Sequence, residues 1–574
     1  MPNNFADARA RGTKTSVRAA LVWVCVALLP VVFLSVFFLW PLVSMVTLGF
    51  SGGGAGGEGA SSVGGAGSGW AGVLEVLGRR RIWQVTAMTV GMAVAGTLGS
   101  VALGIPGAYV LYCLRFRGQR AVRAFVSVPF VLPTMAVAIG FSALFGADAP
   151  LASWHLMGTK TVIVMAMVFF NYSLAVRVIG PLWQGLDPRA QQVAAALGAT
   201  PTRTFFTVTF PALRPAIVSA AAMIFLFCSS AYALVQILGS GNATTLEAEI
   251  YNETVAYMDY RAAAILSLLQ IAIVLVAVIV SEKLRGSATN AGTQKLGLRP
   301  RLTPSAKHLP ALAVSGATWV FLASPMVALV LRSLRRGGTW TLANYADLLR
   351  ADATDRLQTS VANSLLISVG TALVATGLAV IVGGVIAVIL SRSPRATVAR
   401  VALKALDALF VLPLGVPAVT IGFGFLVSMS GPPLYLATSW LLVPIAQAVV
   451  AVPLVVRTML PALRAIDPRQ REVCATLGAN YWRILATVDG PYLWRTGVIG
   501  AGFALAVSMG EFGATSFLAR PQTATLPVAI YTLAGKPGVT EQGMAMAGSV
   551  ILAVITASIM VAVERFRPSR TAMM

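Results

Sequence analysis

Two stretches of this chain, 280 residues apart, decide its organisation. Residues 187–211 read DPRAQQVAAALGATPTRTFFTVTFP, and residues 467–491 read DPRQREVCATLGANYWRILATVDGP. The same shift relates other matching segments: 130–133 with 410–413, Arg177 with Arg457, and both 245–246 and 250–251 with 525–526 and 530–531. Because one offset relates four separate segments, the sequence indicates an internal repeat of two homologous halves.

The amino-acid composition indicates whether this repeat is surrounded by water or by lipid. Of the 574 residues, 57% are hydrophobic and 11% are charged, and the mean hydropathy is +0.80. Soluble domains carry roughly 25% charged residues. A chain so poor in charge cannot cover a surface that faces water, and one so apolar cannot be disordered. These values exclude soluble enzymes and nucleic-acid readers, and they predict a membrane protein.

Apolar runs predict how often the chain crosses the membrane. A helix needs roughly 20 apolar residues to cross the hydrocarbon core. The sequence predicts an all-α polytopic membrane protein with about twelve spans, six in each half. The predicted spans are 21–48, 85–111, 125–146, 161–180, 216–239, 261–281, 311–331, 362–390, 405–429, 439–457, 496–518 and 542–563. An even number of spans per half makes the two repeats parallel.

The charge balance indicates sidedness. Lys and Arg total 43 against 20 Asp and Glu, which gives a net charge of +23. In a membrane protein, basic residues collect in cytoplasmic segments, and most of these lie on the side of the N-terminus. We therefore expect both termini in the cytoplasm of a bacterial cell, with the chain in its plasma membrane. Two clusters oppose this assignment, Arg79–Arg81 and Arg332/Arg335/Arg336.

The predicted organisation is a cytoplasmic N-terminus, two homologous halves, a cytoplasmic linker between them and a cytoplasmic tail. The boundaries are 1–20, 21–281, 282–310, 311–563 and 564–574, with repeated loops at 181–215 and 457–495.

Each repeated loop predicts two short helices on the cytoplasmic side. Asp187 and Asp467 suit the N-cap of the first helix, with proline at its first position. Gly198 and Gly478 suit its left-handed C-terminal end. A connector between helices needs about two to eight residues, whereas these loops are about 30 residues long. A docking element for a partner protein is favoured over a simple connector.

The repeated loops resemble the EAA loop of ABC importer permeases. The residues that carry the resemblance are Gln192, Ala194, Gly198, Phe205 and Pro211 in the first copy, and Glu472, Cys474, Gly478, Leu485 and Pro491 in the second, each after its capping aspartate. The first copy has Gln192 where the pattern has glutamate, and the second has Cys474 where it has alanine. The resemblance implies that each loop docks on one of two ATP-binding subunits, whose closure rocks the two halves.

The fused layout resembles the ferric-iron and thiamine branch of these permeases. Residues 238–251 and 259–263 are similar to thiamine permeases, and residues 510–515 are similar to ferric-iron permeases. The resemblance implies an importer that receives its substrate from an extracytoplasmic binding protein. It leaves ferric iron, thiamine, and another small ion or polyamine open as the substrate.

The chain carries no chemistry of its own that the sequence reveals. No GxxxxGK[ST] phosphate-binding loop occurs, and the Gly535–Lys536 pair is followed by proline. Two histidines and four cysteines without metal-ligand spacing predict no metal site. We expect no enzyme activity and no bound cofactor here, with ATP and Mg²⁺ on the partner subunits and no nucleic acid bound.

A secondary transporter with twelve spans is the alternative reading, since such proteins also have parallel halves. It predicts paired carboxylates in the membrane for coupling ions and no docking loops. Glu511 is a single carboxylate inside a predicted span, and its repeat mate is Ala231. A charge at mid-membrane costs about 2.5–3.5 kcal/mol. Glu511 therefore either lines a path for a cationic substrate or stabilises helix contacts through hydrogen bonds.

Overall fold

The computed structural model describes residues 27–51, 69–289, 302–349, 361–391, 410, 413, 415–432 and 434–565. The predicted cytoplasmic N-terminus 1–20, residues 290–301 of the linker 282–310 and nearly all of the tail 564–574 lie outside these ranges.

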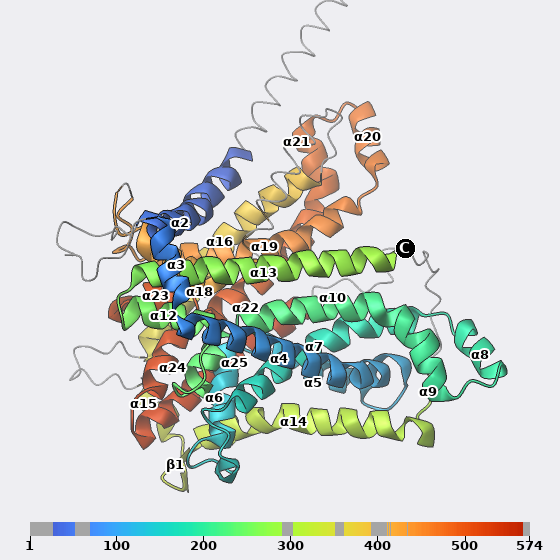
Figure 1. The fold of residues 1–574 in the computed structure, drawn as a ribbon. Helices are drawn as coiled ribbons and strands as arrows, with labels where there is room; N and C mark the ends of the chain where they lie inside the picture. The colour runs from blue at the N-terminus through green and yellow to red at the C-terminus, as the bar shows by residue number, and fades with distance from the viewer. Residues whose placement is uncertain are drawn as a thin grey trace, which may run out of the picture.

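The described residues fold almost entirely as helices (Figure 1). Through the linker, the elements are η1 (Ser35–Leu39), α2 (Trp40–Ser51), α3 (Trp70–Gly78), α4 (Arg80–Cys113), α5 (Gln119–Val131), α6 (Thr134–Phe145), η2 (Ala152–Trp154), α7 (Lys160–Gly185), α8 (Arg189–Ala196), α9 (Pro201–Thr204), η3 (Phe205–Thr209), α10 (Phe210–Ser229), α11 (Tyr232–Leu238), α12 (Leu246–Val255) and α13 (Tyr260–Thr289).

The second half repeats this order and adds a small antiparallel hairpin. Its elements are η4 (Ala306–His308), α14 (Leu309–Ser333), β1 (Arg335–Arg336), β2 (Thr339–Trp340), α15 (Ala343–Leu349), α16 (Val361–Leu390), α18 (Ala418–Ser428), α19 (Leu442–Arg464), α20 (Pro468–Thr476), α21 (Tyr481–Ile484), η5 (Leu485–Asp489), α22 (Gly490–Gly510), α23 (Thr515–Leu518), η6 (Pro521–Thr523), α24 (Leu526–Ala534) and α25 (Val539–Arg565).

The described residues contain ten helices that are long and apolar enough to cross a membrane, or eleven if one bent pair is counted. The bent pair is α5 and α6, which meet at 102°. Pro133 stands at this bend and removes a backbone donor there. The predicted ninth span, 405–429, is represented by the 11-residue helix α18, and most residues before it lie outside the described ranges. The predicted count of twelve is therefore not confirmed.

The fifth span of each half is broken, where the sequence predicted the continuous helices 216–239 and 496–518. In the first half, α10 ends at Ser229 and α11 begins at Tyr232. In the second, α22 ends at Gly510 and α23 begins at Thr515. Hydropathy could not reveal these breaks, because the residues on both sides are apolar.

The two halves interlock through their first spans. Helix α2 of the first half packs against α18 of the second, and α14 of the second packs against α4 and α6 of the first. Two glycines permit this close contact. A Cβ on Gly140 would stand 3.1 Å from the carbonyl oxygen of Pro325, and one on Gly424 would stand 3.1 Å from the Cβ of Pro41. The first spans therefore hold the halves together.

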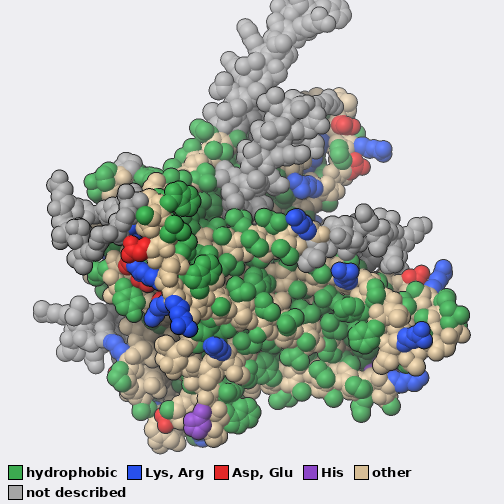
Figure 2. Space-filling view, in the orientation of Figure 1, with side chains coloured by type: hydrophobic (Ala, Val, Ile, Leu, Met, Phe, Trp, Pro, Cys, Tyr) green, Lys and Arg blue, Asp and Glu red, His purple; other side chains and the backbone are tan. Residues whose placement is uncertain are grey.

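The surface matches a protein surrounded by lipid. Figure 2 shows a broad hydrophobic face along the bundle, with Lys, Arg, Asp and Glu side chains gathered toward its two ends. Exposed apolar side chains such as Leu98, Val276 and Leu366 lie on long helices. This distribution leaves an apolar belt between two charged ends, as a spanning protein requires.

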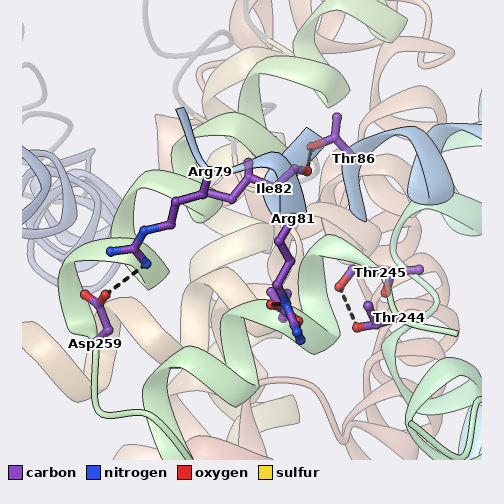
Figure 3. Close-up of polar contacts among 8 residues, drawn as sticks. Arg79, Arg81, Ile82, Thr86, Thr244, Thr245 and Asp259 are labelled. Carbon is purple, nitrogen blue, oxygen red and sulfur yellow. Dashed lines mark hydrogen bonds and ion pairs between the residues drawn. The ribbon is translucent and has the colours of Figure 1, made fainter. Parts of the chain in front are cut away.

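The first arginine cluster that opposed the expected sidedness is paired with acidic residues. Arg79 Nη1 lies 3.3 Å from Asp259 Oδ2 (Figure 3). Arg81 makes a two-pronged contact with Glu249 of α12, in which Arg81 Nη2 donates to Glu249 Oε2 at 3.0 Å. Both acids follow the broken fifth span, at the end of the bundle away from the repeated loops (Figure 1).

The second opposing cluster is also engaged within the protein. Arg336 Nη2 lies 2.7 Å from Asp347 Oδ2, and its Nε donates to Asn344 Oδ1 at 2.9 Å. The guanidinium of Arg335 stacks over the ring of Trp340, 4.5 Å from its centre. Both arginine clusters therefore take part in contacts within the protein, and the sidedness expected from the majority of basic residues stays a prediction.

Replacing Arg81 tests this pairing. Glu249 is 1% exposed, so Arg81→Ala leaves a buried carboxylate without its cation. We expect a loss of about 1–3 kcal/mol, below the full value for a buried pair because Arg81 itself is half exposed. Thermal unfolding of the purified chain in detergent measures the loss. Arg81→Ala/Glu249→Gln should recover most of it, and the exposed neighbour change Arg80→Ala is the control. An equal loss in Arg80→Ala would contradict the pairing.

Candidate functional site

The first repeated loop is built by short-range backbone capping. The side chain of Asp187 accepts a hydrogen bond from the backbone N–H of Arg189 at 2.9 Å, at the start of α8. Thr200 accepts from the N–H of Arg203 and so caps α9. The turn η3 is π-helical, and the N–H of Phe210 closes it on the carbonyl of Phe205. The loop is therefore a structured projection.

Gly198 ends α8 in the left-handed conformation that the sequence predicted. Its φ is +80°. The N–H of Gly198 donates to Ala195 O, and the N–H of Ala199 donates to Ala194 O, both at 3.0 Å. These two bonds form a Schellman motif, which satisfies the last carbonyls of the helix. Any residue with a Cβ is strained at this φ.

The second repeated loop has the same construction. Asp467 accepts from the N–H of Arg469 at 2.9 Å and caps α20, whose first residue is Pro468. Gly478 has φ +79°, and the N–H of Ala479 donates to Cys474 O at 3.0 Å. Ten successive residues, 191–200 and 471–480, share the same order of exposed and half-buried positions. Two different sequences have thus folded into one shape.

Each loop presents apolar side chains to its surroundings. Figure 1 shows α8 and α20 projecting from the bundle, away from α12, α23 and α24. The exposed apolar residues are Val193 (58%), Leu197 (82%) and Phe206 (66%) in the first loop, and Val473 (56%), Leu477 (81%) and Trp482 (55%) in the second. Exposed apolar groups on an ordered projection are typical of a protein-binding surface.

The residues that carried the family resemblance all lie in these loops. Exposed positions are Asp187, Gln192, Gly198 and Pro211, with Asp467, Glu472, Gly478 and Pro491; half-buried positions are Ala194 and Phe205, with Cys474 and Leu485. Phe205 anchors the first loop on the preceding span, because its ring centre lies 6.0 Å from that of Trp183 in α7. Glu511 lies away from both loops, in the break of the second half.

The breaks of the two fifth spans meet between the halves. We call Tyr232, Tyr251, Phe512 and Tyr531 the axial aromatic cluster. The 280-residue shift relates Tyr232 to Phe512 and Tyr251 to Tyr531. The rings of Tyr232 and Phe512 stack with centres 5.3 Å apart and planes at 12°. Tyr251 packs on Tyr232 at 5.7 Å, and Tyr531 packs on Phe512 at 5.2 Å.

Further contacts cross between the halves at this cluster. Gln236 Nε2 donates to the hydroxyl of Tyr531 at 2.8 Å, and the ring of Tyr251 meets Phe517 edge-on at 5.3 Å. Tyr232 and Phe512 are 3% and 2% exposed. The cluster therefore closes the space where the two halves face each other. Sequence reasoning missed its role, although an aromatic residue at both positions of the repeat was a usable signal.

Glu511 turns its carboxylate onto the backbone of its own break. Its Oε1 accepts from the N–H of Ala514 at 2.7 Å, and its Oε2 accepts from the N–H of Thr515 at 3.0 Å. The hydroxyl of Thr515 donates to the carbonyl of Glu511 at 2.9 Å. Glu511 is 6% exposed and stands beside Phe512 of the axial aromatic cluster. It satisfies donors that the break would otherwise leave buried without acceptors.

The first half fills the same need from a different position. The repeat mate of Glu511 is Ala231, and the buried carboxyl comes instead from Glu247 at the start of α12. This carboxyl accepts from the N–H of Tyr232 and the hydroxyl of Ser230. Each broken fifth span is thus held by one buried glutamate, from non-equivalent positions. Sequence reasoning missed Glu247, because no residue pattern ties it to the break.

The short helices after the breaks are fixed by the second spans. The N–H of Leu246, which begins α12, donates to Thr89 Oγ1 of α4 at 2.9 Å. The N–H of Leu526, which begins α24, donates to Ser368 Oγ of α16 at 2.6 Å. A hydroxyl from the second span therefore caps the equivalent helix in each half.

Comparison with known proteins identifies the family to which this architecture belongs. Residues 100–285, which include the first repeated loop and the first broken span, match the family described as "Binding-protein-dependent transport system inner membrane component". The molybdenum transport system permease protein ModB of Escherichia coli (strain K12) is 36% identical over 179 residues, which cover 78% of that protein and 29% of this chain. The chain belongs to this family. It is the permease subunit of an ABC importer, in agreement with the resemblance of its loops.

Other relatives span most of the chain. The thiamine transport system permease protein ThiP of Brucella abortus (strain 2308) is 27% identical over 507 residues, 85% of this chain and 88% of that protein. ThiP of Escherichia coli (strain K12) is 26% identical over 468 residues, 79% of this chain and 84% of that protein. The fused arrangement of two halves is therefore shared with long relatives of this permease.

Proposed function

We propose that this permease imports thiamine, which an extracytoplasmic binding protein delivers, and that ATP hydrolysis by separate subunits drives the import. The observation that carries the proposal is the pair of matched loops with exposed apolar faces, one per half. The relatives that cover both halves are named for thiamine. This favours thiamine over ferric iron, and over the molybdenum named for the shorter relative.

Each loop supplies one docking face, so we infer two ATPase subunits per chain. ATP and Mg²⁺ would be held by those subunits, because the sequence contains no phosphate-binding loop of the P-loop type. Among the residues that the structure describes, no group of three or more His, Cys, Asp or Glu is placed to hold a metal ion. The chain's own part is to convert closure of its partners into movement of its halves.

Sidedness follows from where these partners act. ATP is cytoplasmic, so the docking loops face the cytoplasm, and the paired arginines at the opposite end face outward. Helices α7 and α19 lead into the loops from the outer side, and the termini share the side of the loops. This proposal matches the orientation expected from the majority of basic residues.

The axial aromatic cluster closes the route in the present conformation. Its contacts join the broken spans of opposite halves, so a movement that separates the halves must separate these rings. Both fifth spans continue from the docking loops through η3 and η5. One fifth span therefore connects each docking loop directly to the axial aromatic cluster, so that a displacement of the loop can move the cluster.

Proline at the two C-terminal glycines tests the docking role. Proline requires φ near −65°, whereas Gly198 and Gly478 are at +80° and +79°. We expect Gly198→Pro/Gly478→Pro to abolish co-purification with the ATPase and to lower ATP-dependent uptake of labelled thiamine more than tenfold. The exposed span position in Gly377→Ala, where a Cβ meets nothing within 4 Å, is the control. Unchanged co-purification and unchanged ATP-dependent uptake in the proline variant would refute the docking role. Competition for uptake by ferric iron but not by unlabelled thiamine would refute thiamine as the substrate.

Removing the stacked pair tests the closure. Tyr232→Ala/Phe512→Ala deletes both rings of the central contact, at a cost of about 3–5 kcal/mol for each buried ring. We expect thiamine to leak through proteoliposomes without ATP, at least threefold faster than through the unaltered complex. Tyr232→Phe keeps the ring and should stay tight. A folded alanine variant with no added leak would show that the closure lies elsewhere.

Glu511→Gln tests whether this residue contributes to the path. We propose that Glu511 both holds the break and places negative charge beside the axial aromatic cluster, which favours a cationic substrate such as thiamine. The amide keeps one acceptor and loses the other, which costs about 1–3 kcal/mol. We expect thiamine uptake to fall at least threefold, with the exposed change Glu75→Gln as control. Undiminished uptake in the assembled complex would remove Glu511 from the path.

A further inference from the structure

One contact differs between the two docking loops. In each half, a side chain of the first docking helix reaches the last residue of the π-helical turn that leads into the fifth span. In the first half, Gln191 Nε2 donates to Thr209 Oγ1 at 3.0 Å. In the second, Arg471 Nε donates to Asp489 Oδ1 at 2.9 Å, and Arg471 Nη2 lies 2.7 Å from the same oxygen. The shift of 280 relates both members of the pairs.

The second contact is charged and enclosed. Asp489 is 2% exposed and the side chain of Arg471 is 16% exposed. Arg471 Nη2 also lies 3.4 Å from the carbonyl oxygen of Leu463, near the end of α19. The arginine thus joins three elements: the docking helix α20, the turn η5 and the span before the loop. Gln191 joins two elements, α8 and η3.

The physical character of the contacts differs accordingly. A hydrogen bond between ionised groups is stronger and more directional than one between neutral groups. A buried ion pair also resists partial opening, because each charge left alone is poorly solvated. The capping bonds, the left-handed glycines and the pattern of exposure are otherwise alike in the two loops. The first loop also packs Phe205 of η3 on Trp183 of α7, so the difference at the joint between docking helix and fifth span is a difference in polar contacts.

We propose that Arg471 and Asp489 are positioning residues that make the second docking loop a stiff lever on its fifth span, whereas the first loop moves with more freedom. The inference rests on the proposed function, in which ATPase subunits dock on these loops. The two loops then transmit movement to their fifth spans unequally, although the two halves share one fold. A displacement of the second loop is transmitted almost fully to the break at Glu511 and Phe512. The reason is that the Arg471–Asp489 contact keeps α20 and the start of α22 in a fixed relative position.

The chain itself offers the matched exchange that tests this. Arg471→Gln/Asp489→Thr installs the first half's neutral pair in the second loop and leaves no buried charge alone. The comparison variant Gln191→Ala removes the neutral contact of the first loop. Arg471→Lys keeps the charge with fewer donors. Each variant is reconstituted as the full complex with its ATPase and binding protein, and thiamine uptake is measured per ATP hydrolysed, together with ATPase co-purification and thermal unfolding.

We expect the exchanged variant to assemble, to unfold near the unaltered temperature and to hydrolyse ATP, while uptake per ATP falls at least threefold. Gln191→Ala should change this ratio less than twofold, and Arg471→Lys should lie between. A simple loss of structure would lower assembly and hydrolysis and would leave the ratio intact. The inference is overturned if the exchange leaves uptake per ATP unchanged, or if Gln191→Ala lowers it equally. Failure of the unaltered chain to bind any ATPase would instead overturn the proposed function, and this inference with it.

Discussion

The broken backbone of the two fifth spans is the constraint on which the rest of this structure depends. A helix that stops inside an apolar protein leaves N–H and C=O groups without partners, and each such group is costly. Glu511 satisfies two of these donors directly, and Glu247 meets the same need in the first half. At these secured breaks, Tyr232 at the start of α11 and Phe512 between α22 and α23 stack across the halves. Two buried carboxylates therefore offset the cost of the unpaired backbone groups at the breaks, and the breaks in turn allow the aromatic contact between the halves.

Repetition explains how this centre is connected to the repeated loops, for which we propose a docking role. Each loop is capped by aspartate, ended by a left-handed glycine and joined to its fifth span by a π-helical turn. The path from docking helix to axial ring is thus the same length in both halves. Two things differ: the polar pair at equivalent positions is Gln191–Thr209 in one loop and Arg471–Asp489 in the other, and the buried glutamate of each break, Glu247 or Glu511, comes from a non-equivalent position. Duplication preserved the frame, while the polar contacts within it diverged.

Pairing also explains the distribution of charge. The net charge of +23 suggests a division of basic residues between the two ends, and Arg79, Arg81 and Arg336 do not fit this division when the sequence is considered alone. Each has a carboxylate partner far along the chain or across a hairpin. Arg79 and Arg81 tie the loop after α12 and α12 itself to the start of α4, and Arg336 ties β1 to α15.

The sequence by itself determined the membrane class, the two-half repeat and the local form of the docking loops. Those features depend on composition, on a constant offset and on caps that act within a few residues, such as Asp187 with Arg189 and Gly198 with Ala195. Only the tertiary structure decided the breaks in the fifth spans, the axial aromatic cluster and the pairings of Arg81, Glu247 and Arg471. Glu249 lies 168 residues from Arg81, and Phe512 is in the opposite half from Tyr232. Contacts of this kind are set by how helices pack, which hydropathy and local capping do not encode.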